Sequence, residues 1–189
     1  MEPRNIMNTL YLEKSVGNCR DGKWVEGLDL DGVGRIVVGT GPGSFAGIRS
    51  ALAFAQGYAL GRSCEVLGLP SACALAGDGK LAVVGDARQG MAWVALFDGY
   101  ALVREIFQVE QENLASVVPA DAKVVTPDAA RLDGRLREVF GERYLGGRTP
   151  TDEGLRRFAE ANPSILTREP RPIYLNPAVR SSPSGAFLV

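Results

Sequence analysis

The chain has 189 residues, of which 46% are hydrophobic and 23% charged, and its formal net charge is −1. This composition is that of a folded protein of one large domain or two small lobes, and it excludes a disordered chain, collagen and a coiled coil. The balanced charge argues against a protein that holds nucleic acid by itself, because such proteins usually carry a basic excess. The longest apolar run, Met91 to Phe97, is too short to span a membrane.

The chain contains no histidine. This excludes a Ser-His-Asp triad, a Cys-His pair, an HExxH zinc site and a histidine general base, so we expect no catalytic centre and no metal site. The three cysteines, at positions 19, 64 and 73, form no CxxC pair, which favours a reducing compartment over disulfides or a zinc cluster. No signal-peptide segment is visible at the start, so we expect a cytoplasmic protein, with Met7 as an alternative start.

Apolar runs predict three strands in the first part of the chain, at residues 9–12, 35–39 and 65–69. Arg20-Asp-Gly-Lys23 is typical of a hairpin turn, after which a return strand would begin at Trp24. The spacing of apolar residues predicts a helix over residues 46–60, and Pro70-Ser71 opens a short helix that ends at Ala76.

The second part of the chain predicts strands at residues 81–85, 91–97, 101–109 and 123–126. Helices are expected over residues 111–118, 129–140 and 151–161, the last with an N-terminus at Thr151. Five of the 27 residues from Pro163 onward are proline, which indicates a tail. We therefore divide the chain into an N-terminal lobe (1–78), a C-terminal lobe (79–162) and a Pro-rich tail (163–189).

A glycine-rich loop, Thr40-Gly-Pro-Gly-Ser-Phe45, joins a predicted strand to the first long helix. Backbone N–H groups at such a helix start favour anions, which makes Gly41, Gly43 and Ser44 candidate cofactor-binding residues. The loop lacks the Lys-Ser/Thr of a Walker A sequence and the spacing of GxGxxG. Two interpretations of the loop therefore stay open, a phosphate-binding loop and a simple strand-to-helix turn.

The helix after the loop repeats small residues every four positions. Small residues allow another element to approach closely, so the stripe fits packing on the chain's own sheet or contact with a partner chain. Because Arg49 and Gln56 are the strongly polar groups of this helix, we favour a partner interface on its outer face. The candidate interface residues are Gly47, Ile48, Ala51, Ala55 and Ala59.

The run from Gly39 to Ala59, followed by Leu67-Gly-Leu-Pro-Ser71, resembles the signature of the TsaB (YeaZ) family. Gly85-Asp-Ala-Arg-Gln-Gly90 is similar to a second segment of that family, and Pro172-Ile-Tyr-Leu-Asn-Pro177 to a third. The resemblance implies an α/β fold of two lobes, of the actin-like and ribonuclease-H-like type (the ASKHA superfamily). It also implies a role in placing the threonylcarbamoyl group on adenosine 37 of tRNA.

Members of this family are catalytically silent relatives of TsaD, the subunit that transfers the group. The resemblance implies a heterodimer with a TsaD-like transferase, on which a TsaE-like ATPase docks, with a homodimer as the alternative. Contact with tRNA would occur through the complex, and ATP or ADP would bind at the joint surface rather than to the isolated chain. The N-terminal lobe is abbreviated, because the ~10 residues between Val25 and Arg35 are too few for the family's long helix.

Two other functions stay open. Glu13 and Asp86, at the starts of the two lobes, could hold Mg²⁺ beside the loop Gly41–Ser44 in a small actin-like ATPase. A diverged homologue that associates with itself is the second. We favour the non-catalytic partner subunit, because Glu13 stands where the family has aspartate and no phosphate-binding lysine follows Gly43.

Overall fold

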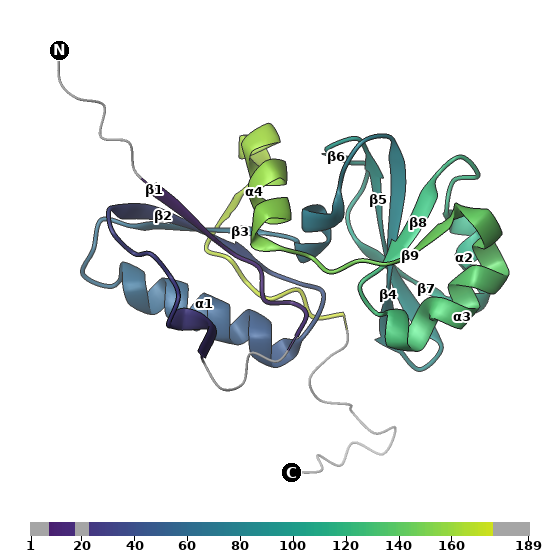
Figure 1. Cartoon of the computed structure of the whole chain (residues 1–189), viewed down its shortest axis with the longest axis horizontal. Coiled ribbons are helices and arrows are strands. Elements are labelled where there is room, and N and C mark those ends of the chain that lie inside the picture. The colour runs from purple at the N-terminus through teal and green to yellow at the C-terminus, as the bar shows by residue number, and fades with distance from the viewer. Residues whose placement is uncertain (1–7, 18–22, 176–189) are drawn as a thin grey trace, which may run out of the picture.

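The computed structural model describes residues 8–17 and 23–175. They form two lobes that lie side by side, each built on its own sheet (Figure 1). Met7 and the residues 20–22 of the expected hairpin turn lie outside the described part. None of the helices within that part has the length and hydropathy of a membrane span.

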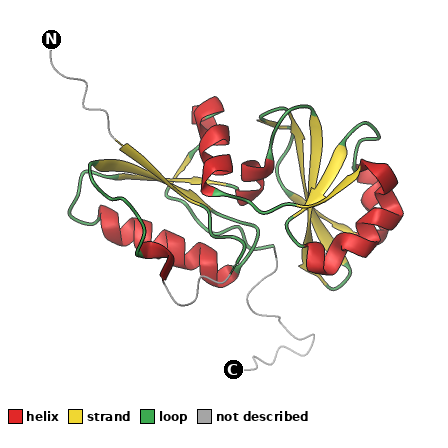
Figure 2. Cartoon of the chain, in the orientation of Figure 1, coloured by secondary structure: helices red, strands yellow, loops and turns green. Residues whose placement is uncertain are grey.

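The first lobe is a sheet of four strands with helices on both faces (Figure 2). Its strand order is β1-β2-β3-β10, in which β1, β2 and β3 are parallel and β10 is antiparallel to β3. The bounds are β1 Asn8–Leu12, β2 Val33–Gly39, β3 Glu65–Leu69 and β10 Thr167–Arg168. The helices are α1 Phe45–Ala59, the 3-10 turns η1 Lys23–Val25 and η2 Ser71–Leu75, and α4 Asp152–Ala161.

Alternation along β2 explains why both faces of this sheet are covered. Ile36 and Val38 belong to the apolar cluster beneath α1, whereas Val37 between them belongs to the cluster that contains α4. Helix α4 starts as expected, since the Thr151 hydroxyl accepts the N–H of Gly154 at 3.0 Å. Both α4 and β10 belong to this lobe, although the sequence placed them in the C-terminal lobe (79–162) and in the tail (163–189), because they pack on and pair with its sheet.

The second lobe is a six-stranded sheet of order β6-β5-β4-β8-β9, with β7 also paired to β5. Its strands are β4 Lys80–Arg88, β5 Met91–Asp98, β6 Ala101–Leu102, β7 Phe107–Glu110, β8 Lys123–Thr126 and β9 Tyr144–Gly147. Helices α2 Leu114–Val117 and α3 Ala129–Phe140 cover the side away from the first lobe (Figure 1). Short 3-10 turns are η3 Gln111–Asn113, η4 Gly141–Arg143 and η5 Pro163–Ile165.

Two predicted strands differ from the structure. The return strand from Trp24 is wrong: β2 is already paired with β1 and β3, and the Trp24 ring instead meets the ring of Phe54 on α1, 5.5 Å between centroids. The strand predicted over residues 101–109 is split into β6 and β7, because the chain leaves the sheet at the exposed polar pair Arg104 and Glu105.

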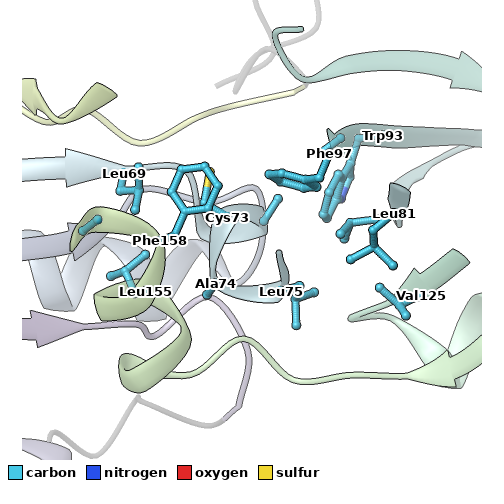
Figure 3. Close-up of a cluster of buried hydrophobic side chains, with 14 of the residues drawn as sticks. Leu69, Cys73, Ala74, Leu75, Leu81, Trp93, Phe97, Val125, Leu155 and Phe158 are labelled. Atoms are coloured by element: carbon cyan, nitrogen blue, oxygen red, sulfur yellow. The ribbon is translucent and has the colours of Figure 1, made fainter. Parts of the chain in front are cut away.

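One hydrophobic core is shared by the two lobes. Figure 3 shows Leu69, Cys73 and Phe158 from the first lobe packed opposite Leu81, Trp93 and Phe97 from the second. The rings of Phe97 and Phe158 meet edge to face, with centroids 5.9 Å apart. Separating the lobes would expose this core to water, so we infer that they move as one body.

Candidate functional site

The glycine-rich loop is held by hydrogen bonds within the chain. The Gly41 N–H donates to the Ser71 hydroxyl at 2.9 Å, and the Ser71 N–H donates back to the Gly41 carbonyl at 2.8 Å. The Ser44 N–H donates to the Ser15 carbonyl at 2.6 Å, and a Cβ at Gly43 would lie 2.5 Å from that same oxygen. Close packing of the loop against the chain therefore explains why glycine stands at positions 41 and 43.

The small-residue stripe of α1 faces the chain's own sheet. Ala51 and Ala55 are fully buried, and they pack with Ile48 on β1 and β2. A Cβ at Gly47 would lie 2.0 Å from the Lys14 carbonyl oxygen. The predicted interface must be corrected for these four residues, because the sheet already occupies them; Ala59 is half-buried.

A different set of residues is exposed on the opposite side of this helix. We call these residues the outer face of α1: Phe45, Ala46, Arg49, Ala53, Gln56, Gly57 and Leu60. Leu60 is 78% exposed, and a Cβ at Gly57 would meet no atom within 4 Å. The signal was present in the sequence as a second, weaker set of small residues, Ala46, Ala53 and Gly57. The outer face is therefore apolar, carries one charge and is open to a partner.

A cleft with a volume of about 580 Å³ lies between the lobes. One wall is the glycine-rich loop with the start of α1, and the other is the end of β4 with the start of α3. Residues 173–175 of the C-terminal segment line it as well. The cleft therefore brings together the loop and the Asp86 segment, the two motifs that the sequence singled out.

The charges in the cleft are largely paired with one another. The Asp86 carboxylate accepts a hydrogen bond from Arg131 at 2.9 Å and lies 3.6 Å from an Arg88 nitrogen. The carboxylate of Asp128 accepts the Asp86 N–H at 2.9 Å. Burial raises the pKa of Asp128, and the neighbouring Asp86 charge raises it further. The negative charge of Asp86 is thus compensated by arginine. Among the described residues, no group of three or more His, Cys, Asp or Glu side chains could hold a metal ion.

Glu13 lies apart from this cleft. Its side chain is buried at the end of β1, where one carboxylate oxygen accepts the Ser15 N–H at 2.7 Å. Burial raises the pKa of this carboxyl group. Its other oxygen would be 1.9 Å from a Cβ at Gly39, and Glu13 is not among the residues that line the cleft. The geometry therefore gives no support to an ATPase in which Glu13 and Asp86 share a metal ion.

The C-terminal segment Pro170–Leu175, here called the strap, connects the two lobes at the cleft. The Ile173 N–H donates to the Thr40 carbonyl at 2.8 Å, and the Gln108 side-chain amide on β7 donates to the Leu175 carbonyl. The ring of Tyr174 lies 5.5 Å from that of Phe45. The sequence marked this segment only as part of a proline-rich tail and by its weak family resemblance.

Comparisons with known proteins agree with this architecture. The family model described as TsaD, tRNA N6-adenosine threonylcarbamoyltransferase, matches residues 25–119, slightly more than half of the chain. A crystal structure described as an uncharacterized protein with similarity to peptidase YEAZ, from Pseudomonas aeruginosa, is 19% identical with a TM-score of 0.67. YeaZ from Pseudomonas aeruginosa is 20% identical with a TM-score of 0.66.

Each of these two likenesses covers 90% of this chain and 100% of the other. The comparison with curated proteins gave no match. At such low identities the solved structures are evidence for the fold alone. They confirm the expected α/β architecture of two actin-like lobes.

Proposed function

The chain belongs to the TsaD family of tRNA N6-adenosine threonylcarbamoyltransferase, and from this premise we propose that it is a non-catalytic partner subunit in that tRNA modification. Within the family we place it with the TsaB (YeaZ) proteins, whose fold it has. The observation that carries the proposal is the family match over residues 25–119, which includes α1 and its outer face. The subunit would bind and stabilise a TsaD-type transferase.

Two features support a role without catalysis. The chain has no histidine, and the carboxylate of Asp86 in the cleft is already bound by arginine. The shared core opposes the opening and closing of the lobes that would admit and enclose a nucleotide. We therefore propose that any ATP or ADP binds at the surface shared with the transferase.

The C-terminal half of the outer face of α1, with Ala53, Gln56, Gly57 and Leu60, is the proposed docking surface. Its small side chains allow close approach of a partner helix, and its exposed apolar atoms would lose contact with water on binding. Between β1 and β2, the Trp24 ring packs against Phe54 and the Leu30 carbonyl accepts the Tyr58 hydroxyl at 3.0 Å, but the outer-face residues of α1 stay exposed. A TsaE-like ATPase would dock on the pair, tRNA would bind through the complex, and a cytoplasmic location would follow.

The test is co-elution of the chain with the TsaD-type protein of the same genome in size-exclusion chromatography. We expect Ala53→Arg and Gly57→Arg to abolish the complex, since both place a long charged side chain on the outer face. Gly134→Arg on α3 is the matched control, because Gly134 is also an exposed helical glycine with open space around it. Ala55→Arg is unsuitable, since it would force an unpaired charge into the core.

The controls distinguish three results. A complex lost only with the two outer-face variants supports the partner role. A complex that survives both variants would move the interface elsewhere. No complex with the wild-type chain, together with sedimentation that depends on the concentration of the chain alone, would support the self-associating homologue instead.

A further inference from the structure

An exposed aromatic pair stands at the mouth of the cleft. Phe45, at the start of α1, is 53% exposed, and Tyr174, on the strap, is 55% exposed. Their ring centroids are 5.5 Å apart, and the Arg49 guanidinium lies 4.9 Å from the Phe45 centroid. Exposing two large aromatic rings side by side is unfavourable in water, so the pair is better explained by a ligand than by packing.

Arginines accompany these rings. Arg88 and Arg131 line the same cleft with side chains 61% and 49% exposed. Both arginines pair with Asp86, and Asp128 is the second carboxylate of the cleft; Arg49 does not line the cleft but stands beside Phe45. The cleft itself therefore balances two arginines against two carboxylates, and Arg49 adds one positive charge beside the aromatic pair. This excess is small, and it suits contact with one or two phosphates rather than with a duplex.

We propose that the cleft mouth, formed by Phe45, Arg88, Arg131 and Tyr174 with Arg49 beside Phe45, binds unpaired nucleotides of an RNA. A base would stack on the open face of Tyr174, and the neighbouring phosphates would lie near Arg88 and Arg131. The RNA as ligand rests on the proposed function, in which the modified molecule is a tRNA.

The chemistry selects unpaired rather than paired RNA. Stacking on aromatic side chains needs a free base face, which a loop offers and a duplex hides. The cleft volume of about 580 Å³ falls in the range of sites that enclose a small organic group, so one splayed nucleotide fits. Because few phosphates are contacted, binding by this chain would be weak alone and would add to that of the transferase in the complex.

The binding test uses a hairpin RNA with an unpaired loop, measured by fluorescence anisotropy with the isolated chain and with its complex. We expect Tyr174→Ala to weaken binding about fivefold or more, and Tyr174→Phe to retain it, because stacking needs only the ring. Phe45→Leu, which keeps an apolar side chain, should also weaken binding. Arg88→Ala should reduce the slope of log K against log salt by about 0.7, the value for one phosphate on a single strand.

A control arginine that makes a similar ring contact outside the cleft, and a mapping experiment, complete the design. Arg104 also stacks on a ring, with its guanidinium 3.8 Å from the Phe107 centroid, but it does not line the cleft, so Arg104→Ala should leave RNA binding unchanged. Photo-cross-linking of the loop through 4-thiouridine should label peptides that contain Phe45 or Tyr174. Thermal unfolding of each variant verifies that it folds.

Several results would overturn the proposal. One is equal affinity for the hairpin and for a fully paired duplex. Another is a Tyr174→Ala chain that binds RNA normally but no longer binds the transferase, which would make the patch a protein contact. Absence of RNA binding by both the chain and the complex would also refute it. If the wild-type chain forms no complex yet binds the loop through Tyr174, the partner role fails and this site stands.

Discussion

Glu13 shows how one residue links the end of β1 to the stability of the fold. Burial raises the pKa of its carboxyl group above the usual value near 4.5. The folded chain then holds a proton that the unfolded chain releases, so stability is complete below that usual pKa and declines as the pH rises towards the folded pKa. Among the described residues, the ionisable groups near Glu13 are Asp152, Lys14 and Cys73. The pKa of Asp128, in the cleft, is also raised and affects stability in the same direction.

We expect Glu13→Gln to flatten this pH dependence, because the amide does not ionise. Urea unfolding of the wild-type chain and of Glu13→Gln, at a series of pH values upward from that usual pKa near 4.5, measures the difference. Asp128 remains in both proteins and cancels in the comparison. Equal pH profiles for the two proteins would show that Glu13 ionises normally in the folded chain.

At the scale of elements, α1 has two faces that differ in what surrounds their small residues. Gly47 is packed against the backbone of Lys14, whereas Gly57 has open space where a side chain would go. Glycine in a helix interior costs roughly 0.5–1 kcal/mol relative to alanine. The presence of Gly57 on an exposed face is therefore a cost to the isolated chain, which fits a helix that a partner approaches closely.

Substitution of these two glycines by alanine tests the orientation of α1. We expect Gly57→Ala to raise the free energy of unfolding by about 0.5–1 kcal/mol. Gly47→Ala should lower it, since its Cβ would be 2.0 Å from the Lys14 carbonyl oxygen. Urea denaturation of both variants provides the measurement, and a reversed order of stability would contradict the orientation of the helix.

At the scale of the whole molecule, the two lobes share a core, so we expect them to unfold together. The two tryptophans lie in different places: Trp24 is beside α1 in the first lobe, and Trp93, on β5, lies in the core between the lobes. In Trp24→Phe and Trp93→Phe variants one tryptophan remains, and its fluorescence transition in urea should coincide with the circular-dichroism transition of the same variant. Transitions with different midpoints would mean that the lobes are independent units.

Substitution of Phe158 on α4 also tests whether the two lobes unfold together. It is fully buried against Phe97 of the other lobe, so Phe158→Ala should cost about 3–5 kcal/mol and lower both transitions equally.

Local patterns in the sequence predicted several elements well. Strands β3 and β8 and helix α3 have the predicted bounds, because continuous apolar runs and four-residue spacing are signals that neighbouring residues alone decide. Elements that depend on distant residues were missed: strands β9 and β10 were not predicted, and the strand predicted over 101–109 is split because it pairs with β5 at two separate places.

The absence of histidine, the glycine-rich loop and the family resemblance were determined by the sequence alone, since each is a matter of residue type and order. The tertiary structure decided the rest. It determined that Ala55 faces inward and Ala53 outward, because both are small and only the position of the sheet distinguishes them. It also brought Tyr174 to Phe45, since the Thr40 carbonyl accepts a hydrogen bond from the strap and the Gln108 amide donates one to it, which holds the strap across the cleft.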